Sequence, residues 1–282
     1  MKWFTFLLVW LGVTALQAQR MPCIGIAAPV ADDSLAADAG YCGLTLSTGQ
    51  WVSPRTVSDS LFQAHLVTLR ALRTPVYAFN LFLPGDLKVT GPDVDTAAVL
   101  AYARQVLARV HATPARLVIW GSGGSRRIPE GYHPDSARAQ FVRIARQIAD
   151  IARPYGITLA LENLNTAECN FITTAAEALA IVRQVDHPYF RLNADLYHML
   201  REHEGPAILR QAGPYLVHVE LAEPDGRTLP CVSGTDFSPY LTVLRQLRYR
   251  RMIGIEGRWD QPAQMIQARP CLAAQIAEVY GE

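Results

Sequence analysis

Apolar runs and helix-like segments alternate along most of this 282-residue chain. Eight short apolar runs have the length and residue types of buried β-strands. They are Cys23–Ala27, Gly43–Leu46, Pro75–Phe79, Arg116–Trp120, Ile157–Leu161, Phe190–Ala194, Tyr215–Leu221 and Arg251–Ile255. Because helical patterns lie between most of these runs, the sequence predicts a series of β/α units.

The clearest helical pattern covers Arg138–Arg153. Phe141, Ile144 and Ile148 recur there at helical spacing, and arginines occupy the opposite face. Similar patterns predict helices at Val99–Val110, Thr173–Val185 and Phe237–Leu247. Residues 47–58 are expected to form an irregular connection.

Eight β/α units fit a single (β/α)8 TIM barrel, a fold that typically has about 250 residues. The strands are near-continuous apolar runs, which is typical of a parallel sheet covered by helices. No linker or internal repeat divides the chain, so we expect one barrel domain over residues 19–282. An open, doubly wound α/β sheet is the structural alternative.

The first 18 residues are typical of a secretory signal peptide. Lys2 precedes an apolar run from Trp3 to Leu16, with small residues at Ala15 and Ala18 where cleavage is expected. The mature protein is therefore expected to be exported, to the periplasm or the medium. An uncleaved anchor is the alternative, but the run is short for a membrane span of about 20 residues. No later segment is long and apolar enough to span a membrane.

Five cysteines are scattered along the chain: Cys23, Cys42, Cys169, Cys231 and Cys271. No CxxC pair is present, which disfavours a zinc site built from cysteines. Export would permit disulfides, and the odd number leaves at least one thiol unpaired within the chain. The spacing does not assign the pairs.

Acidic residues stand directly after three of the predicted strands. Glu162, Asp195 and Glu256 follow the fifth, sixth and eighth strands. In the seventh strand, His218 and Glu220 are two residues apart, so their side chains point to the same face. The active sites of TIM barrels lie at the carboxyl ends of the strands. The sequence therefore predicts that these groups converge at one mouth of the barrel.

Several carboxylates in one pocket repel one another unless a positive charge lies between them. One divalent cation is the simplest such charge. Ligands that are mainly carboxylates favour Mn²⁺ or Mg²⁺, and a histidine ligand keeps Co²⁺ or Zn²⁺ in consideration.

These motifs resemble those of the xylose-isomerase-like barrel superfamily, and within it the sugar isomerases and epimerases related to tagatose and psicose 3-epimerases. Glu162 and Asn165 are similar to the Glu-x-x-Asn of the fifth strand. Asp195 and His198 resemble Asp-x-x-His, in which the aspartate binds metal and the histidine contacts substrate. Glu256 is similar to the last metal-binding glutamate.

The resemblance also implies substrate-binding roles for two residues on loops, Glu168 and Arg227. In addition, residues 234–237 resemble the Gly-x-x-Asp-Phe that opens the following helix. The resemblance covers nearly all of the mature chain, and it is strongest from Arg116 onward.

The seventh strand departs from the pattern of the family. The family usually reads His-x-His there and the second histidine binds metal, whereas this chain reads His218-Val219-Glu220. Glu220 occupies the ligand position and can still bind a hard cation. His218 is the alternative ligand.

The resemblance implies that Glu162 and Glu256 both bind the cation and act as the catalytic acid and base. Removal of a C–H proton beside a carbonyl leaves an enediolate, which a divalent cation stabilises. A positioned carboxylate takes the proton, a contribution of roughly 10²–10⁴-fold. Because phosphorylated sugars are mostly cytoplasmic, an exported enzyme is expected to act on a free sugar or sugar acid.

Two further regions are candidates for contact with the substrate. Residues 121–132 form a glycine-rich stretch without dinucleotide-binding spacing, in which Arg126 or Arg127 could hold an anion or hydroxyl groups. A plain flexible loop is the alternative. Asn80, at the end of the third strand, is the other candidate.

Three alternative functions differ in how well they fit the sequence. An abasic-site endonuclease of this barrel type needs a zinc cluster rich in histidine, but the third and fourth strands end without one. The net charge of +1 also gives no basic surface for nucleic acid. A dehydratase using the same metal site and a catalytically silent sugar-binding barrel both remain. The expected partner is a small sugar, and a homo-oligomer is compatible with the sequence but not indicated by it.

Overall fold

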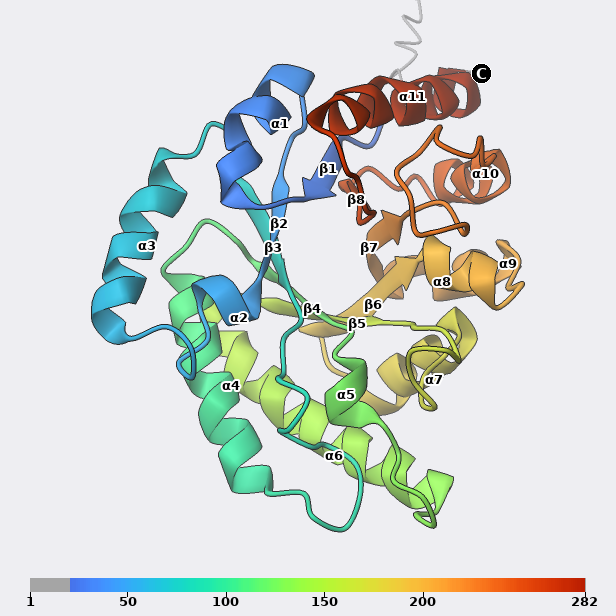
Figure 1. Ribbon diagram of the computed structural model, residues 1–282. Helices are drawn as coiled ribbons and strands as arrows, with labels where there is room; N and C mark the ends of the chain where they lie inside the picture. The colour runs from blue at the N-terminus through green and yellow to red at the C-terminus, as the bar shows by residue number, and fades with distance from the viewer. Residues whose placement is uncertain (1–20, 282) are drawn as a thin grey trace, which may run out of the picture.

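Eight parallel strands close into a barrel in the order β1 to β8, with helices around it (Figure 1). The strands are β1 Ile24–Ala27, β2 Leu44–Ser47, β3 Val76–Asn80, β4 Leu117–Trp120, β5 Thr158–Glu162, β6 Phe190–Asp195, β7 Leu216–Leu221 and β8 Ile253–Ile255. This computed structural model describes residues 21–281, and the predicted signal peptide lies outside that range. Among the described residues, no helix is long and apolar enough to span a membrane.

The eight predicted strands and the TIM barrel are confirmed. The pairing of β1 with β8, in which Gly25 lies opposite Gly254, closes the sheet. The alternative of an open doubly wound sheet is therefore wrong. The apolar runs mark the strands well because both faces of each strand are covered, by the barrel interior and by helices.

The helices of the described chain form the outer layer (Figure 1). They are α1 Asp33–Ala39, α2 Thr48–Trp51, α3 Asp59–Ala71, α4 Thr96–His111, α5 Gly123–Arg126, α6 Pro134–Ala152, α7 Ala175–Val185, α8 Leu196–Arg201, α9 Ala207–Ala212, α10 Ser238–Gln246 and α11 Pro262–Gly281. The four helices expected from periodicity correspond to α4, α6, α7 and α10. The connection expected at residues 47–58 contains one short helix, α2.

The main core lies between the outer surface of the barrel and the helices. Trp120, at the end of β4, is fully buried there. Its ring centroid lies 5.0 Å from that of Phe141 on α6 and 6.1 Å from that of Phe190 on β6. Large aromatic groups thus fix a helix against two strands.

Two disulfides join segments that lie far apart in the sequence. Cys23 pairs with Cys42 next to β1 and β2. Cys231, in the loop after β7, pairs with Cys271 on α11. Cys169 is free and buried, which confirms the expectation of an unpaired thiol.

Strand register brings the acidic strand ends together. Glu162 on β5 lies opposite Asn193 on β6. Asp195 on β6 lies opposite Glu220 on β7, and Glu220 lies opposite Gly254 on β8. The carboxyl ends of β5 to β8 therefore form a continuous acidic edge around half of the barrel mouth.

Candidate active site

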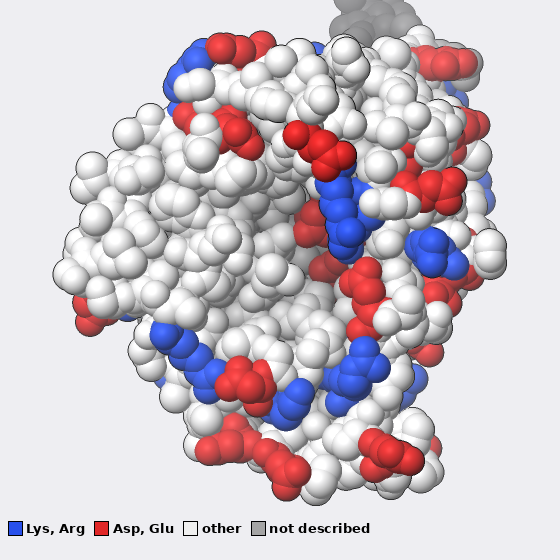
Figure 2. Space-filling model, in the orientation of Figure 1, with Lys and Arg blue, Asp and Glu red and all other residues white. Residues whose placement is uncertain are grey.

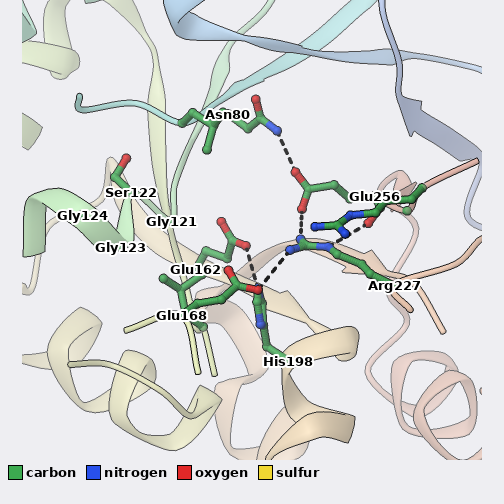
Figure 3. A pocket seen from close by; sticks show the side chains of 14 residues that line it. Asn80, Gly121, Ser122, Gly123, Gly124, Glu162, Glu168, His198, Arg227 and Glu256 are labelled. Atoms are coloured by element: carbon green, nitrogen blue, oxygen red, sulfur yellow. Dashed lines mark hydrogen bonds and ion pairs between the residues drawn. The ribbon is translucent and has the colours of Figure 1, made fainter. Parts of the chain in front are cut away.

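A pocket of about 470 Å³ opens at the carboxyl ends of the strands (Figure 3). Its lining includes Asn80, residues 121–124, Glu162, Glu168, His198, Arg227 and Glu256. The structure thus brings most of the sequence-predicted residues to one cavity, at the end of the barrel where TIM-barrel active sites lie.

Glu162 and Asp195 end the neighbouring strands β5 and β6. Both are almost fully buried, at 6% and 1% exposure. The backbone N–H of Asp195 donates to Oδ1 of Asn163 at 3.0 Å, and Nδ2 of Asn163 donates to the carbonyl of Asp195 at 3.1 Å. This two-way amide contact fixes the two strand ends relative to each other.

His198 points between these two carboxylates from helix α8. Its Nε2 lies 3.6 Å from Oε1 of Glu162 and 3.5 Å from Oδ2 of Asp195. Nδ2 of Asn165 donates to Nδ1 of His198 at 2.9 Å, which leaves Nε2 as the nitrogen that carries hydrogen. Burial lowers the pKa of His198, but the carboxylates of Asp195 and Glu162 raise it more, so the net shift is upward.

Glu220 and His218 are both buried on β7, at different depths. Glu220 lies at the level of Asp195, whereas His218 lies deeper, opposite Asn193. His218 Nε2 is 3.6 Å from Oε1 of Glu220. Burial lowers the pKa of His218 to about 4, so its ring is neutral near pH 7.

Glu256 is held from two sides of the pocket (Figure 3). Nδ2 of Asn80 on β3 donates to its Oε1 at 2.7 Å, and Nη2 of Arg227 donates to its Oε2 at 2.5 Å. Burial, followed by the carboxylates of Glu220 and Glu162, holds the pKa of Glu256 well above its ordinary range.

Arg227 is the positively charged side chain that lies among these carboxylates. Besides Glu256, its guanidinium lies 3.5 Å from Asp195 and 3.4 Å from Glu168. It also covers the ring of Tyr197, at 4.6 Å from the ring centroid. Burial lowers the pKa of Arg227, but the surrounding carboxylates raise it more, so the group stays charged.

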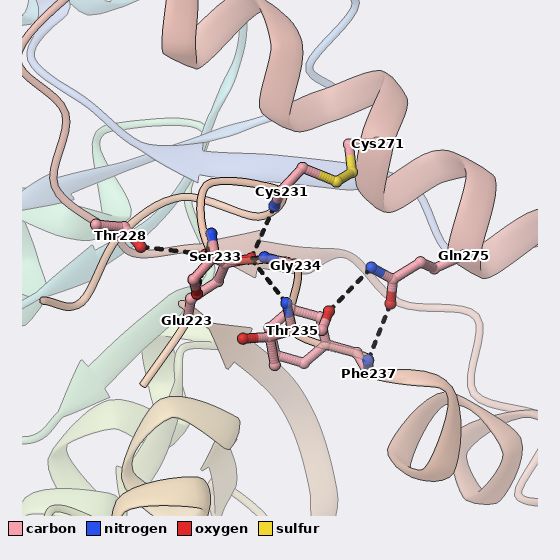
Figure 4. Close-up of a disulfide and its surroundings, with 9 residues drawn as sticks. All are labelled: Glu223, Thr228, Cys231, Ser233, Gly234, Thr235, Phe237, Cys271 and Gln275. Carbon is pink, nitrogen blue, oxygen red and sulfur yellow. Dashed lines mark hydrogen bonds between the residues drawn. A yellow bond between two sulfur atoms is a disulfide. The ribbon is translucent and has the colours of Figure 1, made fainter. Parts of the chain in front are cut away.

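The loop that carries Arg227 is organised by a buried carboxylate, that of Glu223 (Figure 4). Glu223 is fully buried and accepts hydrogen bonds from the backbone N–H groups of residues 231 and 233–235. Burial raises the pKa of Glu223, but these bonds lower it more. The Cys231–Cys271 disulfide ties the same loop to α11.

Two groups of side chains are close enough to hold a cation. Glu162, Asp195 and His198 offer ligand atoms that lie within 4.8 Å of one another, and so do Glu162, Glu220 and Glu256. Among residues 21–281, Oε1 of Glu220 is buried and has no hydrogen-bond partner. Burial, followed by the charges of Glu162 and Asp195, holds the pKa of Glu220 well above its ordinary range. This excess of negative charge fits a divalent cation.

Arg126 does not take the place predicted for it. Its side chain is fully buried and donates to the backbone carbonyls of Trp120, Glu162 and Ile172. It therefore supports the ends of β4 and β5 from behind the pocket, where it is out of reach of a ligand. A buried guanidinium with three carbonyl partners explains why this arginine is tolerated inside the fold.

Sequence reasoning missed the residues that orient the acids. Asn163 and Asn193 lie beside strand-end carboxylates, and nothing in their own spacing indicates this. The importance of Gly121 was easier to recognise in the sequence, because this glycine directly follows a predicted strand. A side-chain carbon at Gly121 would collide with Oε2 of Glu162 and lie 3.0 Å from its carboxyl carbon. The glycine therefore leaves the space that Glu162 fills.

The fold and the acidic strand ends define a (β/α)8 barrel with a cluster of carboxylates and a histidine at its carboxyl mouth that could hold a divalent cation. The family described as Xylose isomerase-like TIM barrel matches residues 34–279, and the chain belongs to this family.

Relatives with an assigned activity cover different shares of the chain. An L-ribulose 3-epimerase of a Methylomonas species is 27% identical over 261 residues, which are 89% of this chain and 82% of the relative. A D-psicose 3-epimerase of Agrobacterium fabrum is 31% identical over 183 residues, which are 61% of this chain and 62% of the relative.

Solved structures agree with this fold. An L-ribulose 3-epimerase superposes with a TM-score of 0.78 at 20% identity, over 92% of this chain and 96% of that one. A D-psicose 3-epimerase, solved in the presence of D-fructose, superposes with a TM-score of 0.76 at 19% identity, over 91% and 95% of the two chains. At this level of identity, these structures support the fold alone.

Proposed function

We propose that the protein is a divalent-metal-dependent isomerase or epimerase of a free sugar or sugar acid, which works through an enediolate. The enzyme belongs to the sugar isomerases and epimerases of its family. Its relatives are named as epimerases of ribulose and psicose at carbon 3. A ketose epimerised at that carbon is therefore the first substrate class to test.

One observation carries the proposal. Four strand-end carboxylates, those of Glu162, Asp195, Glu220 and Glu256, lie close together at the mouth of the barrel. Glu162 and Glu256 line the pocket, and the guanidinium of Arg227 is paired with Asp195 and Glu256. A divalent cation held there would supply positive charge that stabilises an enediolate. Glu162, Asp195, Glu220 and Glu256 would hold it.

Glu162 and Glu256 are the acid and the base of the proton transfer. They approach the pocket from β5 and from the end of β8, so each can serve a different side of a bound sugar. One glutamate removes the proton beside the carbonyl, and the other returns a proton to the opposite face.

The remaining residues orient the substrate. His198 Nε2 is buried, lines the pocket and has no hydrogen-bond partner within the described chain, so it can donate to a sugar oxygen. Glu168 and Arg227 lie at the rim, where hydroxyl groups can bind. Because Arg227 is already paired with Glu256 and Asp195, a phosphate group would meet mostly carboxylates. The pocket therefore favours a sugar without a phosphate group.

Export of the enzyme is part of the proposal. Its support is the expected signal peptide, together with two disulfides, which persist mainly in oxidising compartments. N-terminal mass mapping of the purified protein tests it. A mature chain that retains Met1 would contradict export.

The activity is tested by proton–deuterium exchange. The chelator-treated protein is reloaded with Mn²⁺ and incubated in D₂O with a panel of free ketoses and aldoses, and NMR follows the loss of C–H signals. At least one sugar is expected to incorporate deuterium next to its carbonyl and to give a second sugar. Tight binding of a sugar without exchange would contradict the proposed activity and indicate a binding protein.

A further inference from the structure

Asn193 and Glu220 form a buried pair that no sequence motif indicated. They lie on the neighbouring strands β6 and β7, at 0% and 1% exposure. Nδ2 of Asn193 donates to Oε2 of Glu220 at 2.6 Å. An amide donor is well suited to this place, because it binds a carboxylate without adding charge to a site already crowded with acids.

The contact fixes the carboxylate of Glu220 next to Glu162 and Glu256, which line the pocket. One oxygen of Glu220 lies within 4.8 Å of ligand atoms of Glu162 and Glu256. On the neighbouring strand β8, a side-chain carbon at Gly254 would come within 3.2 Å of Cγ of Glu220. Glu220 therefore has one orientation, set by the amide on one strand and by a glycine on the other.

His218 is excluded from the same role by its depth. It belongs to neither group of close ligand atoms in the described chain. Its ring lies beside that of Tyr77, with centroids 5.5 Å apart, at a level below Glu220. His218 thus packs beneath the carboxylate that Asn193 orients.

We infer that Asn193 is a positioning residue that makes Glu220 a cation ligand, and that this pair sets the cation preference of the site. An oxygen donor at this position favours the hard ions Mg²⁺ and Mn²⁺ over Zn²⁺, which accepts nitrogen donors more readily. The inference rests on the proposed function, because it concerns the cation of the same site. Partners that orient a ligand typically account for about 10–100-fold in metal affinity.

A double-mutant cycle tests the pair in the chelator-treated full chain. Calorimetry measures the dissociation constants of Mn²⁺ and Zn²⁺ for the parent, Asn193→Leu, Glu220→Ala and the double variant. Asn193→Leu keeps a similar volume but removes the donor, and it is expected to weaken Mn²⁺ binding by about 10–100-fold. In the Glu220→Ala background, the same change is expected to alter Mn²⁺ affinity by less than about threefold, because the group that Asn193 orients is absent.

Two more variants complete the test. Asn193→Ala removes the donor without adding bulk and serves if the leucine variant does not fold. Glu220→His places a nitrogen donor at the same point, and it is expected to raise the ratio of Zn²⁺ to Mn²⁺ affinity by about 10-fold or more. An unchanged ratio would overturn the assigned role of the pair in cation preference.

The outcomes distinguish a failure of this inference from a failure of the proposed function. If the parent binds Mn²⁺ and the Asn193 variants bind it equally well, the inference is wrong and the proposed function stands. Equal losses in both backgrounds would also overturn the inference, because they would indicate general loosening of the barrel. If the parent binds neither Mn²⁺ nor Zn²⁺, the proposed function itself is wrong.

Discussion

The two halves of the barrel mouth differ in charge. The half formed by β5 to β8 carries Glu162, Asp195, Glu220 and Glu256, whereas β3 and β4 contribute Asn80 and the glycine-rich residues 121–124. Figure 2 shows that charged side chains lie along the right and lower rims of the hollow, whereas its left wall, on the side of α2 and α3, is largely uncharged.

This difference assigns separate tasks to the two halves. In the proposed function, the carboxylates hold a cation and move a proton, and their position at adjacent strand ends brings them close enough to do so. The uncharged half leaves room for the sugar and supports the acids from across the pocket. Asn80 donates to Glu256, and Gly121 makes space for Glu162. The acidic half therefore depends on the small and neutral side chains that face it.

Loss of a ligand in the acidic half should have the largest effect. Asp195→Ala removes a buried carboxylate at the centre of the site, and we expect the purified protein to lose its divalent ion. Elemental analysis should find about one ion per chain in the parent, the number expected for one such site. Leu81→Ala, at the exposed rim of the uncharged half, should keep the ion. Equal metal content in Asp195→Ala and the parent would remove Asp195 from the site.

Loss of the proton shuttle should come next. Glu162→Gln and Glu256→Gln keep the size of the side chain and one oxygen donor but remove the titrating group. Turnover and deuterium incorporation from solvent should each fall by roughly 10²–10⁴-fold. Variants that retain both the ion and near-normal turnover would show that these carboxylates do not transfer the proton.

A substitution in the uncharged half should lower activity by displacing a carboxylate of the acidic half. Gly121→Ala would push the carboxylate of Glu162 out of its position, and turnover is expected to fall on the order of 10²-fold, as for other small misplacements of catalytic groups. Gly205→Ala is the matched control, because nothing lies within 4 Å of the added carbon. If both variants behaved like the parent, the two halves would be independent.

The disulfides give the smallest expected effect on activity. Loss of Cys23–Cys42 or Cys231–Cys271, whose partners are 19 and 40 positions apart in the sequence, should lower the free energy of unfolding by about 3 and about 4 kcal/mol. Loss of Cys231–Cys271 alone should also raise KM, by up to about 10-fold or about 1.4 kcal/mol, because it frees the loop that carries Arg227. Denaturant unfolding and initial rates of the paired serine variants measure both. An equal rise in KM for the two would mean that the loop is held without its disulfide.

The sequence by itself determined the barrel and most of the acidic edge. Apolar runs separated by helical segments specify β/α units, because each strand must be buried on both faces. The strand-end position of Glu162, Asp195 and Glu256 then followed from the geometry of parallel strands. The two-residue spacing of His218 and Glu220 placed both in the barrel interior but could not say which of them reaches the level of the other acids.

The tertiary structure decided that question and the supporting contacts. Glu220 lies at the level of Asp195 because of a register shift between β6 and β7, which no local pattern encodes. The bond from Asn193 to Glu220 joins residues 27 positions apart, and the bond from Asn80 to Glu256 joins residues 176 apart. The prediction that Arg126 contacts a ligand was wrong for the same reason, because the carbonyl groups that it binds belong to other segments of the chain. Such contacts depend on the register of neighbouring strands and on which side chains meet across the mouth of the barrel, and both are fixed only when the barrel closes.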